Sequence, residues 1–275
     1  MNTTTLAPLP PLREVIARHG LSARRSLGQH FLLDPALAAR IVRAAGPLTG
    51  RHVVEIGAGP GGLTRALLAS EAESILAVEV DPRAVGALEE LAVHASGRLQ
   101  ILAADARALD LAALVPPPRQ IIANLPYNIG TSLLIGWLHQ ADAFEQMTLM
   151  FQEEVAQRII AAPNSAAYGR LSVLAQFVCD VRLVLRLSPQ AFVPPPKVSS
   201  AVVQLRPRRP LPDTRLREAL ERLTAAAFGQ RRKMLRRTLA PLGGEALLAR
   251  AGISGERRAE SLSVAEFAQL AALLA

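Results

Sequence analysis

The sequence predicts an α/β protein with a mainly parallel sheet, followed by a small C-terminal helical domain. The first observation is that strand-like and helix-like patterns alternate from residue 51 to residue 162, as in strands joined by crossover helices. The second is a run rich in Pro and Arg at 206–212, which indicates a linker. Beyond it, 216–275 has helical spacing broken by glycines. We therefore expect domains at 1–207 and 208–275.

Each element is predicted from the spacing of apolar residues and from the residues that start and stop helices. A short helix at 11–19 ends at Gly20, and Asp34 before Pro35 starts a second helix. The expected strands of the alternation are 51–56, 74–80, 99–103, 120–123 and 146–151. The expected helices are 61–70, 82–95, 131–140 and 153–162. Strands at 181–187 and 200–206 complete one edge of the sheet.

Composition restricts the partners and the compartment. The net charge of +8 over 275 residues favours a polyanionic partner, either nucleic acid or an anionic membrane. The single Cys179 excludes an intramolecular disulfide and a multi-cysteine zinc site, so we expect no metal and a reducing cytoplasm. The longest charge-free run, 120–141, contains Pro126 and Gly130 and would make a poor membrane span. We expect a cytoplasmic monomer that binds no membrane.

A glycine-rich turn follows the first strand of the alternation. Gly57, Gly59 and Gly62 fit the G-x-G-x-x-G spacing, which lets the backbone approach a nucleotide closely. Glu79 ends the second strand, where a carboxylate accepts hydrogen bonds from ribose hydroxyls. Asp105 follows the third strand and could accept a hydrogen bond from an adenine amine. These residues predict a nucleoside site but fit a dinucleotide enzyme equally well, and the glycines alone fit a tight turn.

The fourth strand ends in the tetrapeptide Asn124-Leu125-Pro126-Tyr127, which resembles the Asn-Pro-Pro-Tyr motif of amino-methyltransferases. An exocyclic amine is a poor nucleophile because its lone pair is delocalised into the base. Hydrogen-bond acceptors on the amine hydrogens, here the Asn124 side-chain oxygen and the Leu125 carbonyl, favour a more nucleophilic geometry. Pro126 stiffens the loop and removes a competing donor, and Tyr127 offers a flat face to an extruded base. An ordinary strand end with a core Tyr is the alternative.

A second aromatic residue lies in the proline-rich segment Phe192-Val-Pro-Pro-Pro-Lys197. Three prolines make a stiff loop, which we expect to project Phe192 and Lys197. Stacking on a base and a phosphate contact are the functions that these side chains suit. Simple packing of the loop by Phe192 is the alternative.

Six segments together resemble the small-subunit ribosomal RNA adenine N6,N6-dimethyltransferases, over Leu12 to about Leu239. The segments are 26–34, 55–59, 124–129, 151–159, 192–198 and 227–236. The resemblance implies a Rossmann-like class I methyltransferase domain that uses S-adenosyl-L-methionine. It implies dimethylation of two adjacent adenosines near the 3′ end of the small-subunit (16S) RNA, and a role in late small-subunit biogenesis.

The resemblance also implies which residues bind the cofactor: His30, Leu32, Gly57, Gly59, Glu79, Asp105 and Asn124. Two positions depart from the usual pattern. His30 stands where many relatives carry Asn, and a neutral imidazole can replace a side-chain donor or acceptor. Ala58 stands where Pro is common.

Charge placement indicates where RNA binds. Residues 208–275 carry a net +6 of the total +8, which argues against a uniform bias towards Arg. The densest run is 231–237, and on a helix Arg232 and Arg236 would project together. Arg suits phosphate because its planar fork binds in a bidentate manner. The expected RNA contacts are Arg24, Arg25, Lys197, Arg231, Arg232, Lys233, Arg236 and Arg237.

Three alternative functions share part of this pattern. A large-subunit rRNA adenine dimethyltransferase has the same catalytic motif, but the Phe192 loop and the segment 230–232 favour the small-subunit family. A non-catalytic nucleic-acid-binding relative, such as a transcription factor on this fold, would not need the intact motif at 124–127. An NAD-dependent oxidoreductase explains the glycines and Glu79 but neither the motif nor the basic tail.

Overall fold

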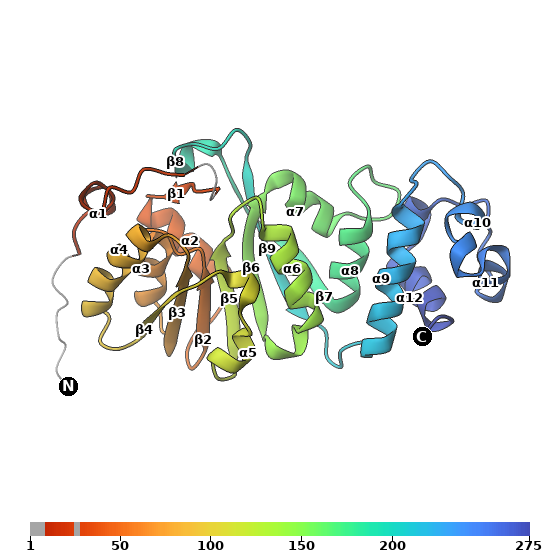
Figure 1. Cartoon of the computed structure of the whole chain (residues 1–275), viewed down its shortest axis with the longest axis horizontal. Coiled ribbons are helices and arrows are strands. Elements are labelled where there is room, and N and C mark those ends of the chain that lie inside the picture. The colour runs from red at the N-terminus through yellow and green to blue at the C-terminus, as the bar shows by residue number, and fades with distance from the viewer. Residues whose placement is uncertain (1–8, 25–27) are drawn as a thin grey trace. The chain divides into compact units, whose positions relative to one another are not determined.

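A seven-stranded sheet forms the centre of the fold in the computed structural model, which describes residues 9–24 and 28–275 (Figure 1). The strand order is β4-β3-β2-β5-β6-β9-β7, and the pairs from β4 to β6 are all parallel. The strands are β2 (His52–Ile56), β3 (Ser74–Glu79), β4 (Leu99–Ala103), β5 (Arg119–Asn124), β6 (Gln146–Gln152), β7 (Cys179–Leu187) and β9 (Ser200–Pro207). The predicted α/β class with a mainly parallel sheet is confirmed.

The helices of the first part of the chain are α1 (Leu12–Arg18), α2 (Pro35–Ala44), α3 (Gly62–Leu68), α4 (Pro82–Val93), α5 (Leu111–Leu114) and α6 (Gly130–His139). Sequence signals start two of them. The Asp34 carboxylate accepts from two backbone N–H groups at the start of α2, and Asp81 caps α4 in the same way. Proline follows each cap, where its missing N–H costs no helical hydrogen bond.

The chain divides into two compact units, one made of residues up to Glu153 with Leu183–Gln204, the other of Glu154–Arg182 with Leu205–Ala275. The second unit contains α7 (Glu153–Ile160) from Glu154 onwards, α8 (Arg170–Val178), α9 (Thr214–Phe228), α10 (Leu235–Thr238), α11 (Gly244–Arg250) and α12 (Val264–Ala272). Within it, α8, α9 and α12 pack against one another. The second unit therefore combines the residues from Leu205 onwards with a segment that precedes the proline- and arginine-rich run. The functional boundary at 207/208 stays a prediction.

Three features escape the sequence patterns. Helix α8 is buried on most sides, at Leu171–Ala175 and Val178, so it has no polar face that would reveal helical spacing. The two-residue strands β1 (Phe31–Leu32) and β8 (Phe192–Val193) pair with each other and are too short to show a period.

Within the described residues, no helix is long and apolar enough to cross a membrane.

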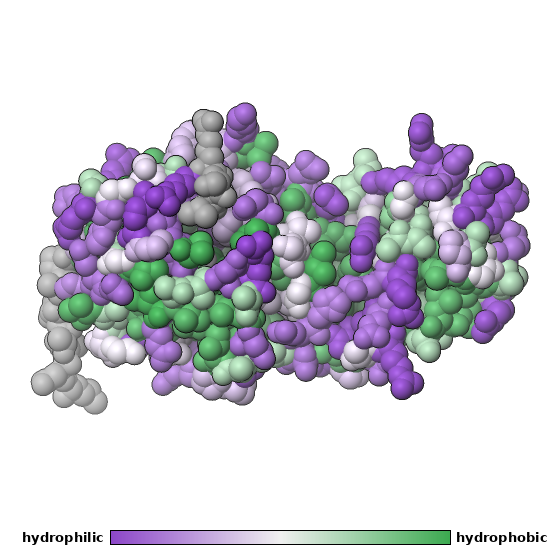
Figure 2. All heavy atoms as spheres, viewed as in Figure 1, coloured by the Kyte–Doolittle hydropathy of each residue, from purple (hydrophilic) through white to green (hydrophobic). Residues whose placement is uncertain are grey.

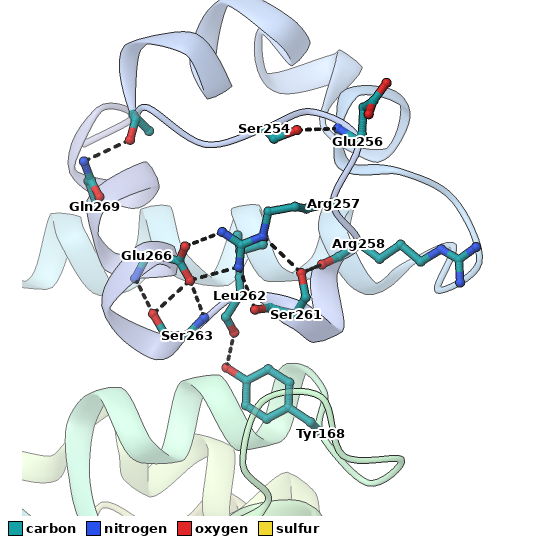
Figure 3. Close-up of polar contacts among 11 residues, drawn as sticks. Tyr168, Ser254, Glu256, Arg257, Arg258, Ser261, Leu262, Ser263, Glu266 and Gln269 are labelled. Carbon is teal, nitrogen blue, oxygen red and sulfur yellow. Dashed lines mark hydrogen bonds and ion pairs between the residues drawn. The ribbon is translucent and has the colours of Figure 1, made fainter.

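A cluster of polar contacts lies at the start of α12 in the second unit (Figure 3). The Glu266 carboxylate accepts from the Ser263 backbone N–H at 2.7 Å and from the Arg257 guanidinium, and Ser263 Oγ accepts from the Glu266 N–H. This is a capping box with an added cation. Nearby, the buried Tyr168 hydroxyl donates to the Leu262 carbonyl at 2.9 Å. The cluster ties the loop before α12 to the helix.

We predict that Glu266→Gln lowers the free energy of unfolding by about 1 kcal/mol at pH 7, the usual value of a helix cap. Arg257 holds the pKa of the Glu266 carboxyl at about 2. Because this pKa is depressed in the fold, the contribution is complete above the ordinary pKa of 4.5 and is lost as the pH falls towards 2. Urea unfolding of wild type and variant at pH 7 and pH 3 measures the difference in the free energy of unfolding. Glu256→Gln, which changes an exposed side chain, is the control. A loss equal at both pH values contradicts the prediction.

Candidate active site

A cleft lies at the carboxyl ends of the parallel strands, where ligands bind in open α/β sheets. Five segments line it. They are 28–32, 55–63 without residue 61, 78–80, 104–107 and 124–129. In the sheet order β4-β3-β2-β5, one of these segments lies at the carboxyl end of each strand. The parallel topology therefore brings the predicted motifs together at one edge of the sheet. All belong to the first compact unit.

The glycine turn after β2 approaches its neighbours more closely than a side chain would allow. Gly57 has φ +69° and Gly59 has φ +56°, a left-handed conformation that other residues avoid. A Cβ on Gly57 would lie 3.3 Å from Pro126 Cδ, and one on Gly62 would lie 2.3 Å from the Leu32 carbonyl oxygen. The turn therefore packs directly against the tetrapeptide after β5 and against β1.

Glu79 has a structural role as well as the predicted binding role. One carboxylate oxygen accepts from the Gly59 N–H at 2.8 Å, and the other accepts from the N–H groups of Val80 and Asp81 at 2.8 and 2.9 Å. The side chain is 5% exposed. Glu79 thus fixes the glycine turn to the end of β3, and the oxygen that bonds only Gly59 keeps a lone pair for a ribose hydroxyl.

Asp105 lies in the same cleft but is engaged by a neighbour. The Arg107 guanidinium makes a bidentate contact with the Asp105 carboxylate, with Nη2 to Oδ2 at 2.5 Å. These hydrogen bonds hold the pKa of Asp105 at about 2, so the group is an anionic acceptor at neutral pH. Arg107 also lines the cleft, and no sequence motif indicated it.

Asn124 is oriented by a single hydrogen bond. Its amide nitrogen donates to the His30 carbonyl oxygen at 3.2 Å. Because a carbonyl only accepts, the Asn124 side-chain oxygen is the other end of the amide and is free to accept from a ligand. Within the described part of the chain, no hydrogen bond engages the Leu125 carbonyl either. Two hydrogen-bond acceptors without a donor among the described residues therefore lie together at the end of β5.

The Tyr127 ring lies beside them, half-buried. Its hydroxyl hydrogen bonds to Ser200 Oγ at 2.6 Å, and burial raises the pKa of the phenol. Its centroid is 5.4 Å from that of the His30 imidazole, with the planes at 33°. Leu32 also lines the cleft, with its side chain buried in the core. The predicted cofactor-binding and tetrapeptide residues thus all border one cleft.

The family model for the ribosomal RNA adenine dimethylases matches residues 20–275 of this chain. The chain belongs to this family. It is 58% identical over 270 residues to the ribosomal RNA small subunit methyltransferase A of Gluconobacter oxydans, covering 98% of this chain and 89% of that one. It is also 58% identical over 271 residues to the protein of the same name from Paramagnetospirillum magneticum, covering 98% and 96%.

Two solved structures show the same relationship. A dimethyladenosine transferase from Plasmodium falciparum is 25% identical, with a TM-score of 0.76, covering 88% of this chain and 96% of that one. The 23S rRNA methyltransferase ErmE is 28% identical, with a TM-score of 0.67, covering 88% and 98%. The Rossmann-like class I methyltransferase fold expected from the sequence is therefore confirmed.

The proline-rich loop of this family member does not project its aromatic residue, so that expectation is wrong. Phe192 is 1% exposed and belongs to the core cluster of the first unit. The reason is β8, whose pairing with β1 places Phe192 opposite Leu32. Lys197 is exposed as expected. A stacking role for Phe192 requires the ring to leave the core. The aromatic rings that line the cleft are those of His30, Phe31 and Tyr127.

The predicted helix through 231–237 is also wrong. Helix α9 ends at Phe228, a turn covers 229–233, and the short α10 begins at Leu235. Arg231 is tied to the protein, since its guanidinium donates to the carbonyls of Ala166 and Tyr168. Arg24 is exposed, and Arg25 lies outside the described residues.

Four basic residues of this region are exposed, and their side chains make no hydrogen bond or ion pair within residues 9–24 and 28–275: Arg232, Lys233, Arg236 and Arg237. We call them the cationic patch. Figure 2 shows hydrophilic residues gathered over α10.

Glu55 is the site residue that sequence reasoning missed. It precedes the glycine turn, lines the cleft and is 2% exposed. Its Oε2 is buried without a hydrogen-bond partner among the described residues. Burial, with a contribution from nearby Glu79, raises the pKa of Glu55 to about 8. A carboxyl group with an unused oxygen in a cleft is suited to a cationic ligand group. The only sequence signal was an acid within an apolar strand.

We predict that Glu55→Gln stabilises the fold at alkaline pH. Because the pKa is raised in the fold, Glu55 contributes stability fully below the ordinary pKa of 4.5, and this is lost as the pH rises through about 8. The neutral amide removes that loss. Urea unfolding of wild type and variant at pH 5 and pH 8.5 measures it, with exposed Glu73→Gln as control. Parallel stability profiles for wild type and Glu55→Gln would disprove it.

Proposed function

We propose that this protein transfers methyl groups from S-adenosyl-L-methionine to the N6 amine of adenosines in small-subunit ribosomal RNA. The proposed products are two adjacent dimethyladenosines near the 3′ end of the 16S RNA, made by a cytoplasmic monomer during late assembly of the small subunit. Membership of the adenine dimethylase family supports the reaction, and the names of relatives that are 58% identical support the small subunit. The observation that carries the proposal is the orientation of the Asn124 amide.

The residues of the cleft fit this cofactor. S-adenosylmethionine supplies an electrophilic methyl group on a positively charged sulfonium. The unpartnered Glu55 oxygen suits its ammonium group, and the free lone pair of Glu79 suits a ribose hydroxyl. The turn at Gly57 and Gly59 gives a backbone cradle that side chains would fill. Asp105 is the acceptor proposed for the adenine amine, and the segment with His30 and Leu32 closes the cleft from the N-terminal side.

The tetrapeptide activates the amine without a strong base. The Asn124 oxygen and the Leu125 carbonyl accept hydrogen bonds from the N6 amine, which localises the lone pair on nitrogen. With S-adenosylmethionine held in the cleft, this lone pair would take the methyl group, and the electrons of the broken carbon–sulfur bond would stay on sulfur. The extra proton then leaves N6 for solvent. Pro126 offers no N–H to compete for the acceptors, and Tyr127 supports the base by stacking. The rate gain comes from position and fixed dipoles.

The basic residues outside the cleft supply RNA affinity in this proposal. The cationic patch is exposed and lacks protein partners in the described residues, as a phosphate-binding surface requires. Arg24, Arg25 and Lys197 are the proposed contacts on the methyltransferase domain. Arg231 is proposed to act chiefly by holding the loop at 166–168, since its guanidinium is already bonded there.

Methylation of the large subunit is the second candidate, favoured by the 28% identity to the 23S rRNA methyltransferase ErmE. Labelled methyl transfer to unmethylated small subunits, large subunits and naked RNA, with identification of the product nucleoside, separates the two. We expect dimethyladenosine in small subunits only. If only large subunits are labelled, the substrate is large-subunit RNA and not the proposed small-subunit RNA. If no RNA is labelled, methyl transfer to RNA is refuted.

We predict that Asn124→Ala lowers methyl transfer by at least about 100-fold, because a preorganised acceptor at the reacting amine is lost. The variant is expected to fold and to bind small subunits as the wild type does. Single-turnover labelling measures the rate, and thermal unfolding and subunit pelleting serve as controls. Turnover within a few-fold of wild type would remove Asn124 from the catalytic role.

We predict that changing Arg232, Arg236 and Arg237 to Gln weakens RNA binding and flattens its salt dependence. Each lost phosphate contact reduces the slope of log K against log salt by about 0.7–0.9. Binding titrations at several salt concentrations measure the slope. The control changes Arg215, Arg222 and Arg250 to Gln, which removes the same charge from exposed positions of the same unit. An unchanged slope in the first variant, or an equal change in both, excludes the patch from the RNA surface.

A further inference from the structure

His30 contacts three parts of the active site at once. Its ring Nδ1 lies 2.8 Å from the Pro194 carbonyl oxygen, in the proline-rich loop. Its ring packs against the Tyr127 ring, with centroids 5.4 Å apart. Its own carbonyl oxygen accepts from the Asn124 amide at 3.2 Å. One residue therefore touches both the acceptor and the stacking ring of the proposed reaction, as well as a loop 164 residues away in the chain.

The direction of the ring hydrogen bond follows from its partner. A proline carbonyl can only accept, so His30 Nδ1 carries the hydrogen, and in the neutral ring Nε2 is an unprotonated acceptor. The bond fixes the position of the ring and, through it, the peptide that presents the carbonyl to Asn124. The neighbouring residues continue the link, since Phe31 pairs with Val193 and Leu32 with Phe192.

The orientation of the Asn124 amide depends on the position of the His30 peptide. Its hydrogen bond to the His30 carbonyl is the one that decides which end of the amide is an acceptor towards the substrate. A shift of the His30 peptide would release the amide to rotate and present its N–H₂ group to the adenine amine, which is itself a donor. Two donors facing each other would oppose methyl transfer.

We propose that His30 is a positioning residue: by anchoring to the Pro194 carbonyl, it holds Asn124 and Tyr127 in the orientation that the acceptor amine requires. This inference rests on the proposed function, and it is distinct from a contact between His30 and the cofactor. It assigns the proline-rich loop a task in the active site that does not depend on Phe192. The loop is the fixed point from which the N-terminal segment orients the catalytic tetrapeptide.

Side-chain geometry supplies a discriminating set of variants. The amide nitrogen of Asn stands three bonds from Cα, as Nδ1 of His does, so His30→Asn can keep the hydrogen bond to Pro194. The nitrogen of Gln stands four bonds from Cα, as Nε2 does, so His30→Gln cannot place a donor at that point. We expect the fold to tolerate these changes, because the bond between Gln29 and Asp81 and the pairing of β1 with β8 do not involve the His30 side chain.

The test compares His30→Asn, His30→Gln and His30→Ala in methyl transfer to small subunits, with kcat and KM for each substrate. S-adenosylhomocysteine binding by calorimetry is measured in parallel. We expect His30→Asn to keep kcat within a few-fold of wild type. We expect His30→Gln and His30→Ala to lose kcat by about tenfold, the effect of one lost hydrogen bond, in addition to any change in S-adenosylhomocysteine affinity.

Two results would overturn the proposal. If all three variants keep the wild-type kcat, His30 positions nothing. If kcat stays unchanged and S-adenosylhomocysteine affinity falls in all three, His30 acts on the cofactor alone. Neither result touches the proposed function, which fails only if the wild-type protein methylates no RNA.

A spectroscopic measurement tests the hydrogen bond without activity. Long-range ¹H–¹⁵N spectra of the imidazole rings distinguish the two neutral tautomers, and the signal absent from His30→Asn identifies His30 among the five histidines. We expect the tautomer protonated at Nδ1, because Nδ1 donates to Pro194. Protonation at Nε2 alone in the neutral ring would contradict the proposed anchor.

Discussion

The carboxylate of Glu79 holds the site together. It accepts from the Gly59 N–H on one strand end and from the Val80 and Asp81 N–H groups on the next. A buried carboxylate with three backbone donors is satisfied, and removing it would leave those donors without partners. The hydrogen bond from the Gly59 N–H to Glu79 supports the left-handed conformation of the glycine turn. The tetrapeptide after β5 is placed in turn, since Pro126 packs on Gly57.

The same region carries the constraint to the N-terminal segment. Asp81 follows Glu79, caps α4 and accepts from the Gln29 amide at 3.1 Å. Gln29 precedes His30, whose carbonyl orients Asn124. Hydrogen bonds and the peptide link between Gln29 and His30 thus connect the end of β3 with Asn124 at the end of β5, although the two are far apart in the sequence. Orientation of the reacting groups therefore comes from backbone groups together with the side chains of Glu79, Asp81 and Gln29.

Sequence patterns predicted the sheet, the cleft and most of its lining, because each motif follows a strand and parallel strands end at one edge. They failed where tertiary contacts decide. Phe192 looked exposed within its prolines, but pairing between two-residue strands buries it. The basic run at 231–237 has helical spacing, yet the chain turns at 229–233. Arg107 belongs to no motif, although its partner Asp105 lies only two residues away. The contacts of His30 with Pro194 and Asn124 could not be predicted, since they depend on the folded arrangement. Glu55 reads as an ordinary strand acid until its burial is seen.

Two carboxyl groups of opposite character therefore stand at the same strand ends. Both oxygens of Glu79 accept from backbone N–H groups, with one lone pair left for a ligand, whereas Glu55 has an oxygen without a protein donor and a pKa raised to about 8. Part of that elevation comes from the charge of Glu79, so the pair resists holding two negative charges in a buried place. A ligand group with a positive charge relieves this repulsion, which agrees with the proposed binding of a cationic cofactor beside these two carboxyl groups.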